Sequence, residues 1–547
     1  MSASRKKQLR SAENAAKMTE KQLTEQKEAK KLKIMTTVFV VVLAAMVVFA
    51  AWTAISKTVT HSGIAERKSI AMTVGEHQIN SAEMNYFFID AVNKLYSEYG
   101  DYITLILDPT VPLNEQVVDE ESGETWADEL LVSAQENVKA VYALSDEAAA
   151  QGYALSETEL QSVESQLAYL GIYASYYGYS NTEDYLKAMY GNGATEESYR
   201  EYFERTMLAD SYQSYYANNL TYEDADLRAA EAENYNEYSA YSYNSYYISP
   251  SRFLEGGTTD EEGNTTYSDE ETAASVAAAE AVAQSLVNDS ITSVAALDAA
   301  IAALEVNAET EGAASYAYEN LGYSSVNSVI REWVADEARV EGDLTYIAST
   351  STTTDEDGNE VTTTNGFYVV YFVGSSDNNY PLANVRHILV SFEGGTTDET
   401  TGTTTYSDDE KAAAKTAAEE LLASWEAGDA TEDSFAALAD ENSDDTGSVG
   451  NGGLYEDIYP GEMVEAFENW CFAEGRKSGD TGIVETEYGY HVMYYSGDSE
   501  TLYRDFLITN ALVSEDSAAW YNALLETMTV SEVNTKYLSL DLVMNAA

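Results

Sequence analysis

The sequence has little of several residues that restrict function. A single cysteine, Cys471, excludes a disulfide framework within the chain, and it lies too far from the N-terminus to carry a lipid anchor. Only 29 Lys and Arg stand against 94 Asp and Glu, a formal net charge of −65. This balance disfavours nucleic-acid binding, because phosphate contacts need clustered basic side chains. Disorder throughout is excluded, since 45% of the 547 residues are hydrophobic, and this length suggests roughly three or four domains.

The charge is unevenly distributed along the chain. Residues 1–33 carry ten basic and four acidic side chains, a net charge of +6, so the remaining residues carry −71. Residues 34–55 are uncharged and long enough for one membrane-spanning helix. Because the basic flank favours the cytoplasm, we predict a single-pass cell-membrane protein with a cytoplasmic N-terminus and an extracytoplasmic main part. The alternative is a cleaved signal peptide, whose apolar core is normally only about 7–15 residues long.

Residues 69–235 have the apolar spacing of a mostly helical domain. After an alternating stretch at 70–74, helices are expected at 81–99, 126–151, 157–170, 183–188 and 196–220. Tyrosines are dense at 173–180, either as ordinary core and surface aromatics or as an amphipathic lining for client peptides. The apolar tail at 498–547 is expected to dock on this domain, with a helix at 514–528 and a closing strand at 537–543.

An internal repeat occupies the region beyond residue 240. The segment 253–260 matches 391–398, and each match leads to an S-x-x-E capping box and an alanine-rich helix. Later matches keep the same internal spacing of 15 residues: Tyr318 with Trp333, and Tyr455 with Trp470. Each unit is about 115–135 residues long, in the expected order strand, hairpin, three helices and two strands. We therefore predict two copies of one domain rather than a solenoid.

The second copy contains the residues best suited to chemistry. His387 and His491 each lie in an apolar strand, and between them a Gly-rich loop begins near Asp445. Met463 and Phe467 are four residues apart, so they share one face of a helix. Each residue also has a purely structural interpretation: a histidine in an apolar strand is often a hydrogen-bonded core residue, Asp445 could cap its loop, and Met463 and Phe467 could be core.

Residues 382–497 resemble the parvulin family of peptidyl-prolyl isomerases. Five features occur in the family's order: the R-H-I-L strand at 386–389, the S-D-D loop at 443–445, the Gly-Gly turn at 452–453, the G-x-M-x-x-x-F helix at 461–467 and the Y-G-Y-H strand at 488–491. The whole architecture resembles PrsA-type foldases and SurA-type chaperones of bacterial envelopes. Those proteins combine a helical chaperone domain, built from both chain ends, with one or two parvulin domains.

The resemblance implies a catalytic group and a pocket for the proline ring, with neither a metal nor another cofactor. The implied catalytic residues are His387, Asp445, Thr486 and His491, and the implied substrate-binding residues are Leu454, Met463 and Phe467. Thr486 would set the tautomers of the histidine pair, and Asp445 would act near the substrate carbonyl. The family's Gly-Gly-Asp-Leu-Gly turn is Gly-Gly-Leu-Tyr-Glu here, so the pocket leucine is either Leu454 or replaced by Tyr455.

The first copy lacks these residues. Our alignment puts Tyr247 and Tyr368 at the histidine positions, Val326 and Ile330 replace the Met/Phe pair, and nothing aligns clearly with Asp445. We predict an inactive parvulin-like fold that serves as a spacer or as a client-binding surface.

The predicted fold is α+β, with an N-terminal transmembrane helix, a mostly helical chaperone domain, two parvulin-like α/β domains with small antiparallel sheets and surrounding helices, and a helical C-terminal tail. Its segments are 1–33 (basic, cytoplasmic), 34–55 (transmembrane), 69–235 (chaperone-like), 240–376 (degenerate parvulin-like), 382–497 (parvulin isomerase) and 498–547 (tail).

The expected function is a membrane-anchored extracytoplasmic peptidyl-prolyl isomerase that assists the folding of exported polypeptides containing X–Pro bonds. A holdase chaperone that uses parvulin folds only as binding modules is the first alternative, and a surface adhesin built of repeats is the second. No nucleic-acid partner is expected.

Overall fold

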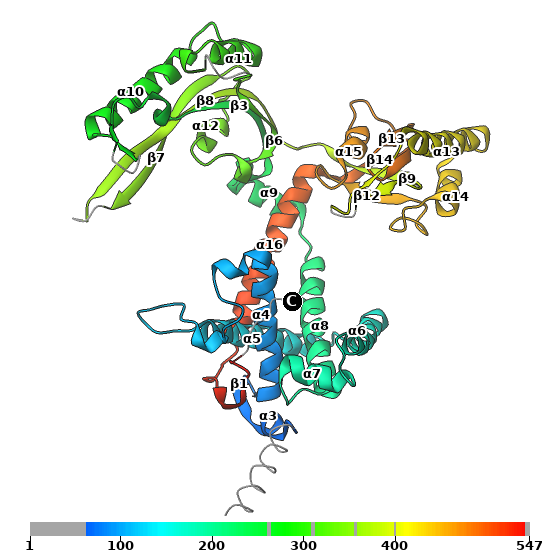
Figure 1. Ribbon diagram of the computed structural model, residues 1–547. Coiled ribbons are helices and arrows are strands. Elements are labelled where there is room, and N and C mark those ends of the chain that lie inside the picture. The colour runs from blue at the N-terminus through cyan, green and yellow to red at the C-terminus, as the bar shows by residue number, and fades with distance from the viewer. Residues whose placement is uncertain (1–61, 260–263, 308–311, 355–357, 399–400, 542–547) are drawn as a thin grey trace, which may run out of the picture. The chain divides into compact units, whose positions relative to one another are not determined.

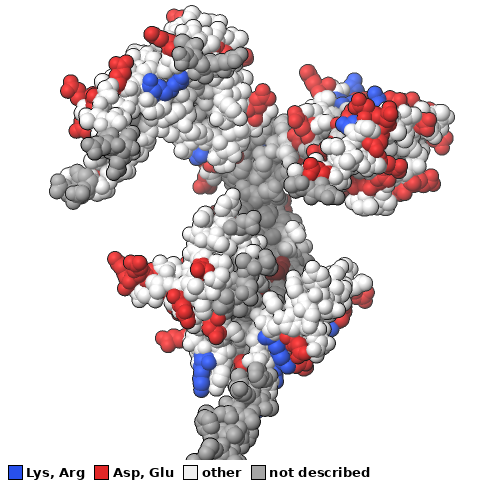
Figure 2. All heavy atoms as spheres, in the orientation of Figure 1, with Lys and Arg blue, Asp and Glu red and all other residues white. Residues whose placement is uncertain are grey.

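The computed structural model describes residues 62–259, 264–307, 312–354, 358–398 and 401–541, and the chain divides into two compact units (Figure 1). Unit 1 contains the chain up to Leu220 and from Glu515 onward, and unit 2 is Thr221–Ser514. The predicted basic segment and transmembrane helix, 1–33 and 34–55, lie outside the described residues. Among the residues that are described, no helix combines the length and apolarity needed to cross a bilayer. Acidic side chains outnumber basic ones on the face drawn in Figure 2.

Unit 1 is mostly helical. It begins with α3 (Ile64–Lys68) and the hairpin of β1 (Ile70–Val74) and β2 (His77–Asn80). Its other helices are α4 (Ser81–Tyr99), α5 (Trp126–Ala150), α6 (Glu157–Tyr176), α7 (Thr182–Tyr190) and α8 (Glu196–Asn218). Ser156 starts α6 through a capping box with Glu159, as the S-x-x-E spacing predicts. The helix runs six residues beyond its expected end at 170, into the tyrosine-rich segment.

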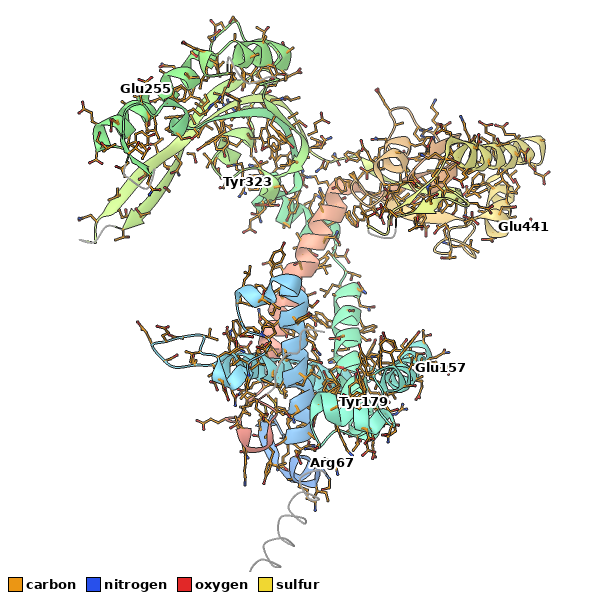
Figure 3. The ribbon with its side chains drawn as sticks, in the orientation of Figure 1. Arg67, Glu157, Tyr179, Glu255, Tyr323 and Glu441 are labelled. Carbon is orange, nitrogen blue, oxygen red and sulfur yellow. The ribbon has the colours of Figure 1, made fainter. Side chains whose placement is uncertain are left out.

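Tyrosines of unit 1 divide between core and surface. Tyr86 and Tyr202 are buried with ring centroids 5.0 Å apart, and the Tyr202 ring lies 4.9 Å from that of Phe87. On α6, by contrast, Tyr176 is 81% exposed, and Tyr173 is exposed one turn earlier. Figure 3 labels Glu157 at the start of this helix and Tyr179 just beyond its end.

The predicted tail at 498–547 is divided: residues 498–514 belong to unit 2, and the part from Glu515 onward belongs to unit 1. At the end of α16 (Tyr503–Glu526), Trp520, Tyr521 and Leu524 pack against the core of this unit. Beyond the helix, the Ser531 and Asn534 backbone N–H groups donate to carbonyls of β1 over 3.0 and 2.7 Å. The helix expected at 514–528 is thus the second half of a longer one. The strand expected at 537–543 is wrong for its described part, where a 3₁₀ turn (Thr535–Tyr537) leads into irregular chain because no neighbouring strand pairs with it there.

Unit 2 contains two four-stranded antiparallel sheets with the same topology, β6-β3-β8-β7 and β12-β9-β14-β13. The strands are β3 (Ala240–Ile248), β6 (Tyr316–Gly322), β7 (Leu344–Thr354) and β8 (Glu360–Ser376), then β9 (Pro381–Ser391), β12 (Leu454–Ile458), β13 (Thr481–Glu485) and β14 (Gly489–Leu502). Short edge strands β6 and β12 were absent from the expected order, since their residues lack a regular apolar alternation. The prediction of mixed helices and small antiparallel sheets is confirmed.

Helices occupy equivalent places around the two sheets (Figure 1). After α9 (Asp224–Glu233), they are α10 (Asp269–Leu286), α11 (Val294–Ala302) and α12 (Arg331–Val334), then α13 (Asp408–Ala427), α14 (Glu432–Asn442) and α15 (Glu465–Cys471). A small hairpin precedes α10 and another precedes α13: β4 (Thr258–Thr259) with β5 (Thr265–Thr266), and β10 (Thr396–Thr397) with β11 (Thr404–Thr405).

Each face of the second sheet has its own core. Ile388 and Val492 point toward Phe435 of α14, and Val385 and Met493 point toward α15. Because side chains alternate along a strand, His387 and His491 share the α15 face with Val385 and Met493.

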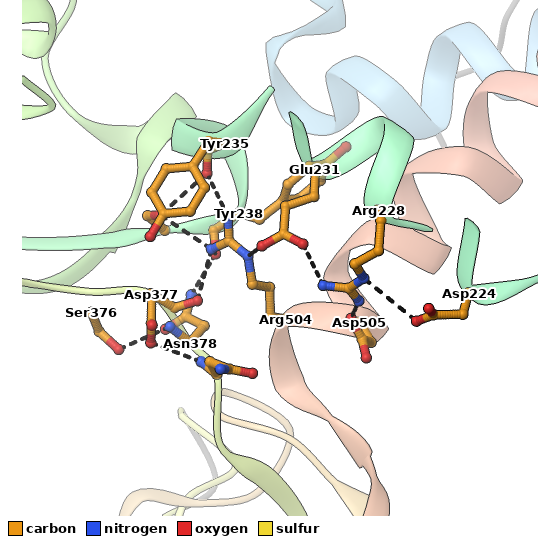
Figure 4. A network of polar contacts seen from close by, with 12 residues as sticks. Asp224, Arg228, Glu231, Tyr235, Tyr238, Ser376, Asp377, Asn378, Arg504 and Asp505 are labelled. Atoms are coloured by element: carbon orange, nitrogen blue, oxygen red, sulfur yellow. Dashed lines mark hydrogen bonds and ion pairs between the residues drawn. The ribbon is translucent and has the colours of Figure 1, made fainter. Parts of the chain in front are cut away.

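Arg504, at the start of α16, ties several segments of unit 2 together (Figure 4). Its guanidinium forms an ion pair with Glu231 of α9 over 2.5 Å and donates to the carbonyls of Tyr235 and Asp377 over 3.0 and 2.7 Å. The side chain is only 2% exposed, and a buried charge needs such partners. This network holds the start of α16 to the segment that connects β8 with β9.

Candidate active site

His387 on β9 and His491 on β14 form a buried pair. The two strands are antiparallel neighbours in which Met493 lies opposite His387 and Leu389 lies opposite His491, so the histidines are diagonal neighbours on one face. Their Nδ1 atoms are 3.0 Å apart, and the rings are stacked with centroids 5.2 Å apart. Both side chains are withdrawn from solvent.

Asp445 and Thr486 extend this pair at its two ends. The His387 Nε2 atom is 2.9 Å from Asp445 Oδ2, and the His491 Nε2 atom is 2.9 Å from Thr486 Oγ1. The structure therefore brings together all four residues proposed as catalytic, in the order Asp445, His387, His491, Thr486.

The direction of these hydrogen bonds follows from the chemistry of their ends. An ionised Asp445 can only accept, so His387 carries its proton on Nε2. A neutral His387 then accepts at Nδ1 from the Nδ1–H group of His491. This leaves His491 Nε2 to accept from the Thr486 hydroxyl. The network thus holds each imidazole in one tautomer.

Charges at the site are consistent with two neutral histidines beside one carboxylate. Burial lowers the pKa of His387 despite the nearby Asp445. Burial, helped by repulsion from His387, lowers the pKa of His491 to about 4. Burial alone would raise the pKa of Asp445, but hydrogen bonds from Ser448, His387 and neighbouring donors outweigh it and lower that pKa to about 2. At neutral pH the pair is therefore uncharged and Asp445 is ionised.

A cavity of about 350 Å³ opens above the histidine pair. Phe467 forms one wall, with its ring edge-on to His387 and His491 at centroid distances of 5.4 and 5.3 Å. The remaining lining residues are Leu389, Asp445, Tyr455, Glu462, Met463, Val464 and Tyr488. A larger cavity of about 990 Å³ in unit 2 has no histidine in its lining, so the smaller one is the candidate site.

Tyr455, rather than Leu454, lies in the cavity. In β12, Tyr455 is opposite Val385 and Leu454 is opposite Arg386, so Tyr455 points to the face that carries His387. Of the three substrate-binding residues proposed, Met463 and Phe467 line the cavity, whereas Leu454 does not.

Two polar contacts at the site had not been expected from the sequence. The hydroxyls of Ser448 and Tyr455 donate to the same oxygen of Asp445, over 2.5 and 3.0 Å. The three-residue spacing between Asp445 and Ser448 is typical of a turn and was a signal for the first contact. The second depends on a strand pairing distant in sequence.

The Gly-Gly turn brings β12 close to β9. Gly453 has a φ of +68°, and an added Cβ would lie 2.2 Å from the carbonyl oxygen of His387. The Gly453 carbonyl accepts a hydrogen bond from the His387 backbone N–H over 2.8 Å. Only glycine fits this approach, which fixes the backbone of His387.

The first copy differs from the alignment at one histidine position. Tyr368 lies opposite Tyr247 in the β3–β8 pairing, as His491 lies opposite Leu389 in the second sheet. Tyr247 is therefore equivalent to Leu389, and Ser245 occupies the place of His387. The correction arises because a short alignment of tyrosines does not fix strand register, whereas hydrogen-bonded pairing does.

Residues 367–496 match the family model of the PPIC-type PPIase domain, the parvulin type of peptidyl-prolyl isomerase. This part of the chain is therefore similar to that domain. The match confirms the resemblance seen in the sequence, and it covers every residue of the site described above. It begins within β8, before the PPIase domain boundary expected at 382.

Curated relatives are similar over part of their length. Foldase protein PrsA 1 of Listeria innocua serovar 6a is 48% identical over 59 residues, which are 11% of this chain and 20% of that protein. Foldase protein PrsA of Exiguobacterium sibiricum is 35% identical over 91 residues, which are 15% of this chain and 29% of that protein. The chain thus spans about a fifth to under a third of the length of these relatives.

Solved structures align with low scores. PrsA from Bacillus subtilis is 13% identical, with 76% of this chain and 91% of that chain covered at a TM-score of 0.26. The peptidylprolyl isomerase PrsA from Bacillus anthracis is 24% identical, with 28% and 59% covered at a TM-score of 0.17.

Proposed function

We propose that this protein isomerises X–Pro bonds in exported polypeptides and assists their folding outside the cytoplasm. The observation that carries the proposal is the neutral histidine pair, anchored by Asp445 and Thr486, beneath a cavity walled by Phe467. The match to the PPIC-type PPIase domain supports the same activity. The uncharged stretch at 34–55 supports attachment to the cell membrane by one helix, with the main part extracytoplasmic.

To catalyse this reaction, the protein needs only to bind the substrate and to stabilise the twisted amide. Rotation about the peptide bond has a barrier of about 18–20 kcal/mol, because the planar amide is stabilised by resonance. Met463 and Phe467 would hold the proline ring against the uncharged histidines, with the rest of the peptide outside the cavity. Since both imidazoles are fixed in one tautomer, their polar groups need not reorient while the amide rotates. No step requires a covalent intermediate.

A protease-coupled assay with a prolyl tetrapeptide tests the proposal on the full chain. We expect acceleration above the uncatalysed rate, and a loss of at least about tenfold in His491→Ala, as when a buried hydrogen bond of roughly 1–3 kcal/mol is removed. Tyr368→Ala, at the equivalent place in the first copy, is the matched control and should leave the rate unchanged. A wild-type rate equal to background, or a His491→Ala rate equal to wild type, contradicts the enzymatic function.

A holdase function is the second candidate, and the exposed tyrosines of α6 favour it. Tyr169, Tyr173 and Tyr176 lie three or four residues apart, so they share one helix face, and all three are exposed. Suppression of aggregation of an unfolded client measures this function. If His491→Ala removes isomerase activity and leaves the suppression intact, the two functions are separate. If Tyr173→Ser with Tyr176→Ser leaves suppression unchanged, this face does not hold clients.

A further inference from the structure

Tyr455 is the point where this site departs from the turn sequence of the parvulin family. Its side chain leaves β12 on the cavity side, and its ring centroid lies 5.3 Å from that of His387 at an angle of 39°. The ring therefore forms a wall of the cavity next to His387, whose ring also contacts that of Phe467. An aromatic ring presents a flat apolar face of this kind to a proline ring.

The hydroxyl of Tyr455 has a second role. It donates to Asp445 Oδ2 over 3.0 Å, the oxygen that also accepts from His387 Nε2 over 2.9 Å and from the Ser448 hydroxyl over 2.5 Å. The other carboxylate oxygen accepts from the Gly447 backbone N–H over 3.1 Å. Four donors thus fix the orientation of one carboxylate, and three of them converge on the atom that anchors His387.

Tyr455 stays a donor across the physiological pH range. Burial, followed by the adjacent Asp445, raises the pKa of the phenol to about 12. Since Asp445 remains ionised, the hydrogen bond between them is charge-assisted, and such bonds are stronger than neutral ones.

We propose that Tyr455 is both a specificity-determining wall of the proline cavity and a positioning residue, which holds Asp445 and through it the Nε2–H tautomer of His387. The inference rests on the proposed isomerase function for its kinetic part. The rate contribution comes from the hydroxyl, which keeps the histidine pair in one hydrogen-bonding state, and the affinity contribution comes from the ring, which contacts substrate.

Tyr455→Phe and Tyr455→Leu separate the two contributions, because the first removes only the hydroxyl and the second also replaces the ring. In the full chain we expect Tyr455→Phe to lower kcat about tenfold with KM unchanged, an effect equivalent to about 1.4 kcal/mol. Tyr455→Leu should lower kcat similarly and also change KM by about threefold or more. Equal KM values in the two variants would overturn the role of the ring. Tyr318→Phe, at the equivalent place in the first copy, is the control that changes neither constant.

The tautomer is measured independently of activity. The chain has only four histidines, so the imidazole ¹⁵N resonances of ¹⁵N-histidine-labelled protein can be assigned with His387→Gln and His491→Gln. We expect the Nε2–H tautomer at His387 in the wild type and in Tyr318→Phe, and a shifted His387 Nε2–H resonance in Tyr455→Phe, because Asp445 then loses one of the donors that orient it. An unchanged His387 spectrum in Tyr455→Phe overturns the positioning role. If the wild type lacks isomerase activity, the proposed function fails, while this spectrum still decides whether Tyr455 positions His387.

Discussion

The two sheets of unit 2 are the same scaffold with and without a polar site. In both, a short edge strand pairs with the first strand of the copy, the first strand pairs with the last, and the last pairs with the strand that precedes it. Both also place a short helix over the face where the site would form. In the second sheet this face carries His387 and His491, whereas in the first it carries Ser245 and Tyr368. The comparison shows that the fold is maintained by the apolar pattern of the strands, and that the polar site adds to the fold without being required by it.

The largest expected difference between the copies concerns the helix that covers this face. Phe467 and Ile330 are both buried, at equivalent positions. Phe467→Ala should cost about 3–5 kcal/mol of stability and remove isomerase activity, because it empties a cavity wall. Ile330→Ala should cost about 2–5 kcal/mol with activity retained. Urea denaturation and the prolyl-peptide assay, run below the denaturation midpoint, measure both. Loss of activity in Ile330→Ala would mean that the copies do not function separately.

Acid should destabilise the second copy before the first. The unfolded chain protonates histidine below about pH 6.5, but burial lowers the pKa of His491 in the folded domain to about 4. The folded state therefore binds fewer protons than the unfolded state in this window. As the pH decreases from 7 to 5, the free energy of unfolding decreases by about 2 kcal/mol from His491 alone. The lowered pKa of His387 acts in the same direction.

Amide hydrogen exchange measures this difference strand by strand. Protection of β9 and β14 should fall between pH 7 and pH 5, after correction for the intrinsic exchange rate, while protection of β3 and β8 changes less. Their sheet contains no histidine. His491→Phe should reduce the pH dependence of β14. An equal loss of protection in both sheets would show that the histidine pair is not what titrates.

The smallest predicted loss of stability, from removing the serine that caps a helix, should be the same in both copies. Ser268 begins α10 and Ser407 begins α13, each through a capping box. The serine hydroxyl accepts from the backbone N–H of the glutamate three residues later, and that carboxylate accepts from the serine backbone N–H over 2.7 Å. Replacing either serine by alanine should cost about 0.5–2 kcal/mol, with the two costs equal within about 0.5 kcal/mol. Denaturation of the two single variants tests this equality. Clearly different costs would show that the two scaffolds are not energetically equivalent.

The sequence predicted the positions of helices and strands better than it predicted how the strands pair. The α4 helix has the expected bounds, since local apolar spacing and caps determine such a helix. Edge strands β6 and β12 were missed, because their pairing depends on residues about 70 positions away rather than on local pattern. For the same reason Tyr247 was assigned to a histidine position that the register gives to Ser245.

The sequence alone showed the motifs that resemble the family, and it proposed the histidines and the carboxylate that the structure brings together. The strand and loop positions of His387, His491 and Asp445 are local features, so they can be read without a fold. Tertiary structure decided which side chain walls the cavity and which hydrogen bonds set the tautomers. The choice of Tyr455 over Leu454 follows from the register of β12 on β9, and the donors from His387 and Tyr455 reach one oxygen of Asp445 from two paired strands. Register and convergence are properties of pairing over long sequence distances, which a local pattern does not encode.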